Sequence, residues 1–506
     1  MRVASIVCVL TALLGPIEGN AQVKDREPQQ QESLQPERTM PEPTLFDLDV
    51  AIPPLDTSHT ANTAHAQTQT LINQPSDLSL ASPGTETDGR SSLTLDGKLP
   101  AAPQPTNSSA AENARPQDAP PTPPPPEPEV TKPEFEVYGF AMLDMGYDFG
   151  QINPAWFDVE RPTKLPAFHN EFGQNGNLYA GVRQTRFGAK ALVPTKLGQL
   201  KTVFEWELFG VGVDAGQTTF RLRHAYGELG QFLAGQTWSP YMDPDVFPNS
   251  IEYWGPNGMV FFRNVQVRWQ PVHNGNHQVM IAVERPGASA DLGSVQDLYI
   301  LQGVQFRFPA PDVTARVRYG GKRTYIQASG IYRYIAWDDN APTAVTNLTG
   351  HANGWGVNVS SNVGFGAKDT LKMSVKYGKG DENYMNDAPV DIAPRLTTNI
   401  RRPLTGEPLP NFGIVAFYDR YWNKQWSSSV GFSLLNMTNA TLQLPDSFRR
   451  GMYGLANLLY YPIDNVMVGG EFIWGRRDNF TDHWVYNDYR VQFSFRYNFS
   501  YKLGGS

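Results

Sequence analysis

The feature that most constrains the fold is an alternation of apolar and polar residues that recurs from Glu134 onward. In VQFSFRYNF (491–499), valine and aromatic residues occupy every second position, and polar residues fill the positions between them. A β-strand places such residues on two opposite faces, whereas a helix would scatter them. The same period recurs in LKTVFEWEL (200–208), VTARVRY (313–319), DTLKMSVKY (369–377) and QWSSSVGFSLL (425–435). The sequence therefore predicts an all-β fold.

Two architectures fit alternating strands: a soluble sandwich with its apolar faces inside, and a membrane barrel with its apolar face outside. The connections favour the barrel, because short links such as PTKLG (194–198), PVHNG (271–275) and PIDN (462–465) alternate with longer ones. Tight periplasmic turns and long external loops are typical of an up-and-down outer-membrane barrel. We predict sixteen antiparallel strands. The strand-like segment 298–308 would break this alternation, so we assign it to the fourth external loop.

Composition divides the chain outside the predicted barrel. Residues 1–21 combine Arg2, an apolar run and small residues, as in a secretory signal peptide, and they contain the single cysteine, Cys8. Residues 22–133 are rich in proline and hold one aromatic residue, so we predict a disordered segment. Residues 1–133 hold 8 Lys+Arg and 17 Asp+Glu; subtraction from totals of 42 and 50 leaves 34 and 33 downstream. The acidic balance therefore belongs to the N-terminal part. We assign 134–499 to the barrel and 500–506 to a C-terminal extension.

The parity of each strand predicts which side chains face the lumen. In FRLRHAYGEL (220–229), Leu222 shares a face with Phe220, His224 and Tyr226, and we expect this face to contact lipid or a neighbouring subunit. Arg221 and Arg223 then face the lumen. His224 is an unusual neighbour for lipid, and we interpret it as part of a subunit contact.

Several segments resemble the DcaP-like porins, which are trimeric outer-membrane channels associated with dicarboxylate and related anionic solutes. These segments are RQTRFGAKALVPTKLGQLKTVFEWELFG (183–210), FRLRHAYGELGQFLAGQTW (220–238) with the MDPDVFP and GPNG that follow, and NLLYYPIDNVMVGGEFIWGRR (457–477). The resemblance implies a sixteen-stranded trimeric porin whose third external loop, here 239–258, folds into the barrel and narrows it. The coiled-coil segment typical of the family is not expected here, because residues 22–133 show no heptads.

Lumen parity and the inserted loop together give the candidate site. The predicted pore-lining, anion-binding residues are Arg186, Lys201, Arg221, Arg223, Arg268, Arg316, Arg318 and Arg496. The predicted constriction-loop residues are Asp243, Asp245 and Glu252. Basic residues outnumber acidic ones on the lumen side, which favours anions, and the loop acids would face the basic wall and create a transverse field. The alternative for any one arginine is an ion pair that holds the barrel's shape.

Other signals point to no enzyme, cofactor or metal site. Asp381, Glu382, Asp387 and Asp391 could bind a divalent cation, but we interpret them as solvated loop acids. The expected partners are small anionic or polar solutes, outer-membrane lipids and lipopolysaccharide, two further copies in a homotrimer, and no nucleic acid. We expect the barrel in a bacterial outer membrane with residues 22–133 in the periplasm, where they could reach peptidoglycan. The alternative function is a structural protein that links membrane and cell wall through this tail.

Overall fold

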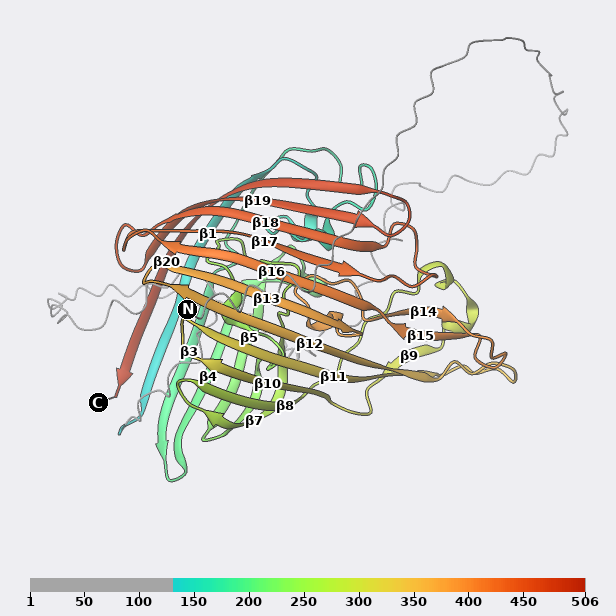
Figure 1. Cartoon of the computed structure of the whole chain (residues 1–506), viewed down its shortest axis with the longest axis horizontal. Helices are drawn as coiled ribbons and strands as arrows, with labels where there is room; N and C mark the ends of the chain where they lie inside the picture. Colours follow the sequence, from blue (N-terminus) through green and yellow to red (C-terminus); the bar gives the residue numbers. More distant parts are fainter. Residues whose placement is uncertain (1–130, 506) are drawn as a thin grey trace, which may run out of the picture. The chain divides into compact units, whose positions relative to one another are not determined.

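The computed structural model describes residues 131–505, and their strands close into a single antiparallel barrel (Figure 1). The predicted signal peptide and almost all of segment 22–133 lie outside the described residues. The wall is formed in chain order by β1 (Glu134–Asp148), β2 (Asn177–Gly181) with β3 (Arg186–Thr195), β4 (Gly198–Phe209), β5 (Thr218–Leu229), β6 (Phe232–Trp238), β7 (Arg263–His273), β8 (His277–Glu284), β10 (Asp312–Gly320), β11 (Tyr325–Asp339), β12 (Gly350–Phe365), β13 (Asp369–Lys379), β16 (Pro410–Tyr421), β17 (Trp426–Met437), β18 (Phe448–Tyr460), β19 (Val466–Asn479) and β20 (Val485–Gly504).

Sixteen strand positions result, as predicted from the sequence. The sheet contains 18 strands, but β2 and β3 both pair with β1 and share one position. The short strand β9 (Val304–Arg307) pairs only with the far end of β11, at Ala336–Asp339, while β8 pairs directly with β10. Since 18 less these two is 16, the prediction that segment 298–308 belongs to a loop is confirmed. Its strand-like pattern reflects β9, which extends the sheet at the end of β11 but does not run the length of the barrel.

The barrel closes where β1 meets β20. Their pairing runs without interruption from Glu134 opposite Gly504 to Asp148 opposite Arg490. The last strand therefore continues past Phe499 into the segment that the sequence assigned to a C-terminal extension. Residues 500–504 complete hydrogen bonding with the start of β1, so the boundary at 499 falls inside a strand.

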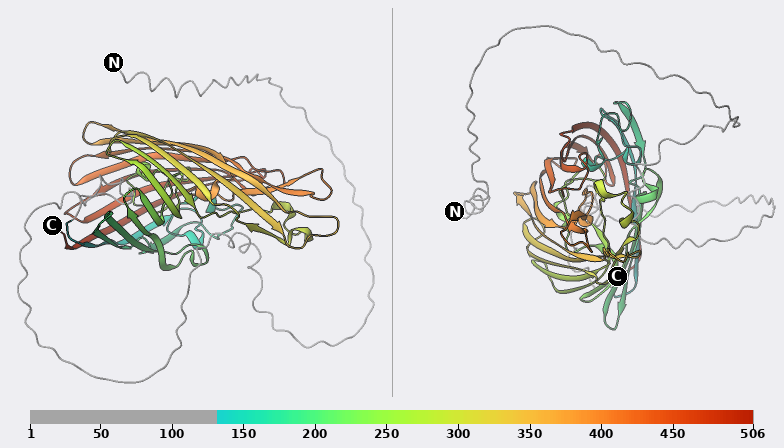
Figure 2. Two further views of the ribbon diagram at one scale, coloured as in Figure 1. Left: turned by 90° about the horizontal axis from the view of Figure 1, so that it is seen from below. Right: turned by 90° about the vertical axis from the view of Figure 1, so that its right-hand side faces the viewer.

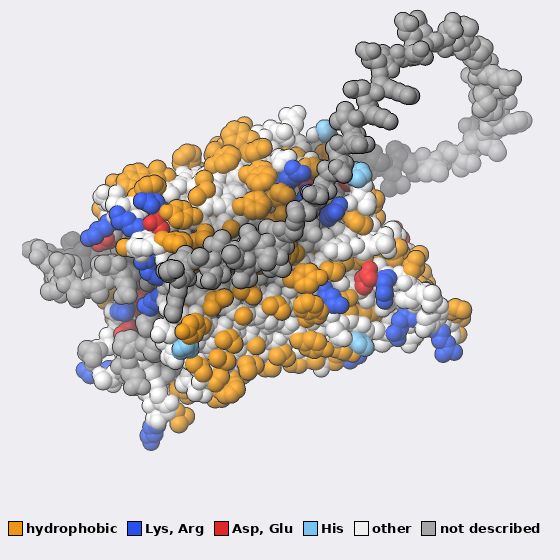
Figure 3. Space-filling view, in the orientation of Figure 1, with side chains coloured by type: hydrophobic (Ala, Val, Ile, Leu, Met, Phe, Trp, Pro, Cys, Tyr) orange, Lys and Arg blue, Asp and Glu red, His pale blue; other side chains and the backbone are white. Residues whose placement is uncertain are grey.

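The outer surface of the barrel is covered by apolar side chains (Figure 3). In β20, Phe493, Phe495 and Tyr497 are exposed, whereas the alternate residues Gln492, Ser494 and Arg496 are buried. The same alternation runs along most wall strands, as the exposed valines of β7, β8, β10 and β12 show. Apolar groups that face outward while polar groups face inward match a wall immersed in hydrocarbon. In the part of the chain described, 131–505, no helix is long and apolar enough to cross a membrane.

The two ends of the barrel differ in their connections. Links of two to five residues, from 196–197 to 461–465, join strands at one end, which we call the turn end. At the other end, the loop end, lie loop 1 (149–176), loop 3 (239–262), loop 4 (285–311) and loop 6 (380–409). Loop 6 carries its own hairpin of β14 (Ile392–Leu396) and β15 (Leu404–Pro408).

Loops 3 and 6 fold into the barrel and pack against one side of its inner wall (Figure 2). Apolar residues of loop 3, including Met242, Phe247 and Met259, form a buried cluster with inward residues of β16–β19, such as Phe417 and Ile473. These strands thus contribute apolar residues to the interior beside polar ones such as Ser433 and Glu471. On this side, apolar residues of the strands form the surface on which the loops pack. The inward fold of loop 3 is as predicted.

Candidate functional site

The inner wall over β4 and β5 departs from simple alternation, and this changes the facing of two residues. Glu205 and Glu207 point inward from β4. On β5 the register shifts, so that Glu205 pairs with His224 while Trp206 pairs with Leu222, which leaves Arg223 as an extra residue. Such a bulge moves the residues beyond it to the other face. His224 is consequently buried, and its Nδ1 lies 3.0 Å from the hydroxyl of Thr237.

Two expectations from parity are therefore wrong. His224 does not lie on the outer surface, so it forms no subunit contact there, and Tyr226, two residues further along, does not share the outward face of Leu222. Arg221 and Arg223 both face inward as predicted, one on each side of Leu222. The bulge preserves this arrangement while it adds the imidazole to the polar interior.

Four arginines surround two carboxylates on this wall, and we call them the arginine cluster: Arg186, Arg221, Arg223 and Arg263 around Glu205 and Glu207. Glu207 is fully buried, and its Oε2 lies 2.6 Å from Nη1 of Arg223 and 3.2 Å from Nη2 of Arg186. Its Oε1 accepts a hydrogen bond from the hydroxyl of Tyr253 on loop 3. Four positive charges less two negative ones leave the cluster with a net charge of +2.

Arg221 is the solvent-accessible member of the cluster. Its side chain is 27% exposed, whereas those of Arg186, Arg223 and Arg263 are between 4% and 8% exposed. Its distance to Glu207 is 3.7 Å, longer than a hydrogen bond, so its donors remain available. A guanidinium in this state can bind a carboxylate with two parallel hydrogen bonds.

Sequence reasoning missed Arg263. It is the first residue of β7, directly after loop 3, and the predicted lumen positions of that strand have even numbers. Its guanidinium nevertheless turns inward over the ring of Trp238, at 4.7 Å, and lies 3.8 Å from Glu207. Strand parity does not extend to a residue at the junction with an inserted loop, so no pattern in the sequence gives this position.

A second basic site lies closer to the turn end. Arg268 on β7 and Arg316 on β10 have no ion-pair partner among residues 131–505, and each has a buried Nε without a hydrogen bond. Arg316 donates to the amide oxygen of Gln278 at 3.1 Å. Lys201 lies near the turn end of β4, opposite Glu228. Arg496 is buried under the ring of Phe140 on β1, at 5.3 Å.

The acids of loop 3 form direct contacts instead of facing the basic wall across an open gap. Asp243 lies 2.8 Å and Asp245 lies 2.6 Å from the guanidinium of Arg318, and all three side chains are buried. Tyr325 also donates to Asp243. Glu252 accepts hydrogen bonds from the backbone amides of Glu160 and of loop 3 itself. Arg318 therefore forms a structural ion pair, which is the alternative to a pore-lining role.

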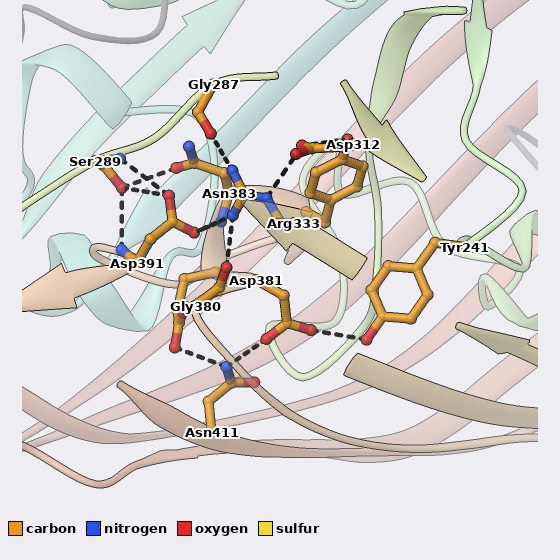
Figure 4. Close-up of polar contacts among 12 residues, drawn as sticks. Tyr241, Gly287, Ser289, Asp312, Arg333, Gly380, Asp381, Asn383, Asp391 and Asn411 are labelled. Carbon is orange, nitrogen blue, oxygen red and sulfur yellow. Dashed lines mark hydrogen bonds and ion pairs between the residues drawn. The ribbon is translucent and has the colours of Figure 1, made fainter. Parts of the chain in front are cut away.

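The acids of loop 6 are also buried, so their interpretation as solvated is wrong. Arg333 on β11 joins Asp312 on β10 at 3.1 Å to Asp391 on loop 6 at 2.7 Å, and it donates to the carbonyl oxygen of Gly380 (Figure 4). Asp381 accepts from Tyr241 of loop 3 at 2.8 Å in the same network. Ion pairs and hydrogen bonds thus hold loops 3 and 6 to the wall.

Exposure distinguishes two parts of the inner wall. On β11–β20, the buried charged side chains include Arg333, Lys372, Lys376, Asp419, Glu471, Arg477, Asp488, Arg490 and Arg496. By contrast, Arg221, Lys190, Lys201, Glu228 and Arg268 on β3–β7 are partly exposed. Lys190 is paired with Glu136 at 3.0 Å. The accessible part of the wall is therefore the basic part.

Comparisons with known proteins agree with this barrel. A family model, the DcaP outer membrane protein, matches residues 123–499. The outer membrane channel DcaP of Acinetobacter baumannii has a similar structure, with a TM-score of 0.60, 19% identity, and coverage of 73% of this chain and 98% of that one. The anion-selective porin from Comamonas acidovorans aligns at a TM-score of 0.46 and 9% identity, over 73% and 100% of the two chains. No curated protein matches this chain.

Proposed function

The chain belongs to the DcaP outer membrane protein family, and from this premise we propose that it is a porin for passive diffusion of small hydrophilic solutes that favours anions such as dicarboxylates. The arginine cluster carries the proposal. It combines a net charge of +2 with the exposed guanidinium of Arg221, on the part of the inner wall that solvent reaches. A channel with a basic lining attracts anions and repels cations.

A solute with two carboxylates suits the succession of basic sites. Along the strands, Arg221 lies towards the loop end, and Arg268 and Arg316 lie towards the turn end of the same side. Arg221 and Arg268 are partly exposed, and the buried Arg316 lies beyond them; no carboxylate among residues 131–505 accepts a hydrogen bond from any of the three guanidinium groups. An anion could therefore exchange one arginine for the next as it moves, without a step in which its charge lacks a partner.

Reversal potentials test the preference. The purified full-length protein is inserted in a planar bilayer with a tenfold gradient of KCl, and we expect a reversal potential with the sign of chloride selectivity. A cation-selective potential would contradict the proposal. Liposome swelling with succinate, acetate and an uncharged sugar of similar size then tests whether dianions pass fastest.

Arg221→Gln is the sharpest single substitution, because it removes the exposed charge and keeps the three buried arginines. We expect the anion-to-cation permeability ratio to fall by about two- to fivefold, equivalent to roughly 0.4–1 kcal/mol for a charge partly screened by water. Lys322→Gln, which removes an exposed charge at the turn end, is the matched control and should leave the ratio unchanged. Equal effects from both would remove Arg221 from the solute path.

The assembly and surroundings are part of the same proposal. We infer a homotrimer that contacts lipids and lipopolysaccharide through its apolar outer face, with the loop end outside the cell and residues 22–133 in the periplasm. The band of exposed apolar side chains supports the lipid contact. Three equal closure steps in a bilayer recording would support the trimer, and a single step in every recording would contradict it.

A further inference from the structure

Three carboxylates meet where loop 1 crosses the closing strands of the barrel. Asp148 ends β1, Asp488 lies on β20, and Glu160 belongs to loop 1. One oxygen atom from each lies within 4.8 Å of the others, and all three side chains are buried. Two ligands on opposite sides of a calcium ion, each 2.3–2.6 Å from it, have about this separation.

The protein supplies too little positive charge to neutralise these three carboxylates. Arg490 pairs with Asp148 at 2.7 Å and is 3.9 Å from Glu160. Three negative charges and one positive charge leave a net charge of −2 in a place without solvent. Burial of such an excess is costly unless it is compensated.

Independent evidence for a missing ligand comes from the hydrogen bonds. Glu160 is 1% exposed, yet neither of its carboxylate oxygens accepts a hydrogen bond, and Oδ2 of Asp488 also lacks a donor. By contrast, Oδ1 of Asp148 accepts from the amide of Gly150, and Oδ1 of Asp488 accepts from the amide of Tyr489. Oδ2 of Asp148 accepts from the guanidinium of Arg490. The oxygens without a donor therefore belong to Glu160 and Asp488, and these are available to a cation.

Glycines make the space for these groups. A Cβ atom at Gly475 on β19 would lie 1.8 Å from Oε1 of Glu160, and one at Gly150 would lie 2.2 Å from Oδ1 of Asp488. Any other residue at either position would displace a carboxylate. The two glycines thus leave room for the carboxylates of Glu160 and Asp488.

We propose that Asp148, Glu160 and Asp488 bind a divalent cation, calcium by the fit of its distances and its tolerance of irregular oxygen sites. The ion balances the charge of −2 and fastens loop 1 across the junction of β1 and β20. This site is separate from the arginine cluster, and it does not depend on the solute that the channel carries.

Terbium luminescence tests the site, since Tb³⁺ replaces calcium and is excited through nearby tyrosines. Tyr179 lies over Arg490, and Tyr486 has its hydroxyl next to Gly150. The full-length chain is refolded in detergent without lipopolysaccharide, whose phosphates bind the same ions. We expect tyrosine-sensitised emission that calcium abolishes by competition, and at least a tenfold weaker apparent affinity in Glu160→Gln and in Asp488→Asn.

Glu171→Gln is the matched control, because it removes a carboxylate from the same loop outside the cluster. It should bind Tb³⁺ like the unaltered chain. Heat-dependent mobility in electrophoresis verifies that each variant is folded. Calcium should raise the melting temperature of the unaltered chain and of Glu171→Gln, but not that of Glu160→Gln or Asp488→Asn. The proposal is overturned if the unaltered chain shows no calcium-sensitive emission, or if Glu160→Gln and Asp488→Asn both retain it.

Discussion

Individual residues on the inner wall have two different roles. Arg221 lies at the edge of its ion-pair network with part of its guanidinium in solvent, whereas Arg318 is enclosed by Asp243 and Asp245. Both are arginines on lumen-facing positions of neighbouring parts of the barrel. The contacts, and not the residue type, decide whether an arginine can meet a solute.

Substitution of Arg318 should therefore affect stability. Arg318→Gln leaves two buried carboxylates without their cation, and we expect the free energy of unfolding to fall by about 3–5 kcal/mol. Guanidinium unfolding in lipid vesicles measures it. The triple variant Arg318→Gln with Asp243→Asn and Asp245→Asn should recover part of the loss, and Arg323→Gln at the turn end should have little effect. An unchanged stability in Arg318→Gln would contradict the structural role of this pair.

Lys164 in loop 1 gives a pH dependence. Burial, assisted by the nearby charge of Arg161, lowers the pKa of Lys164 from 10.5 to about 8. Between these values the unfolded chain holds a proton that the folded chain has lost, so the free energy of unfolding should rise with pH from about 8 to about 10.5. Lys164→Met should remove this part of the dependence in unfolding experiments at several pH values. The same slope in the variant would exclude Lys164 as its source.

At the scale of elements, the strands could be predicted and the loop contacts could not. Period-two alternation identified the sixteen strands and the inward facing of Arg221, because facing depends only on the pleat. It failed beyond the bulge at Arg223, where one extra residue moved His224 inward. The pairing of Asp243 with Arg318 joins residues 75 positions apart, so it depends on how deep loop 3 descends, which no local pattern records.

Loop 3 lies directly against the arginine cluster, where Tyr253 contacts Glu207 and Arg223. Replacement of residues 244–257 by a short Gly-Ser linker removes Tyr253 together with Val246 and Phe247 of the buried cluster. We expect single-channel conductance to increase by about twofold or more, since conductance follows the open cross-section. Shortening of the mostly exposed loop 5 (340–349) should leave conductance unchanged. If the two variants conduct alike, loop 3 does not set the constriction.

For the molecule as a whole, the barrel wall is complete without the N-terminal region. β1 starts at Glu134 and pairs with β20 along its full length, so the barrel closes without residues 22–133. A chain in which these residues are deleted should keep the conductance and reversal potential of the full chain in bilayers. A large change in either would place the tail in the solute path.

The alternative function is a structural link between the outer membrane and the cell wall, formed by residues 22–133. A pull-down with purified peptidoglycan, with and without residues 22–133, tests it independently of conductance. Binding that requires these residues would add a tether to the channel. If peptidoglycan captures both chains equally, residues 22–133 do not bind it.

The cluster of Phe417, Ile473, Met242 and their neighbours gives this membrane protein an interior like that of a water-soluble domain, built beneath one arc of its wall. Substitutions should therefore have different effects on the arc of β3–β7 and on the arc of β16–β19. Substitutions on the arc of β3–β7 should alter the selectivity of the proposed channel, while substitutions beneath β16–β19 should lower the amount of folded protein in the membrane.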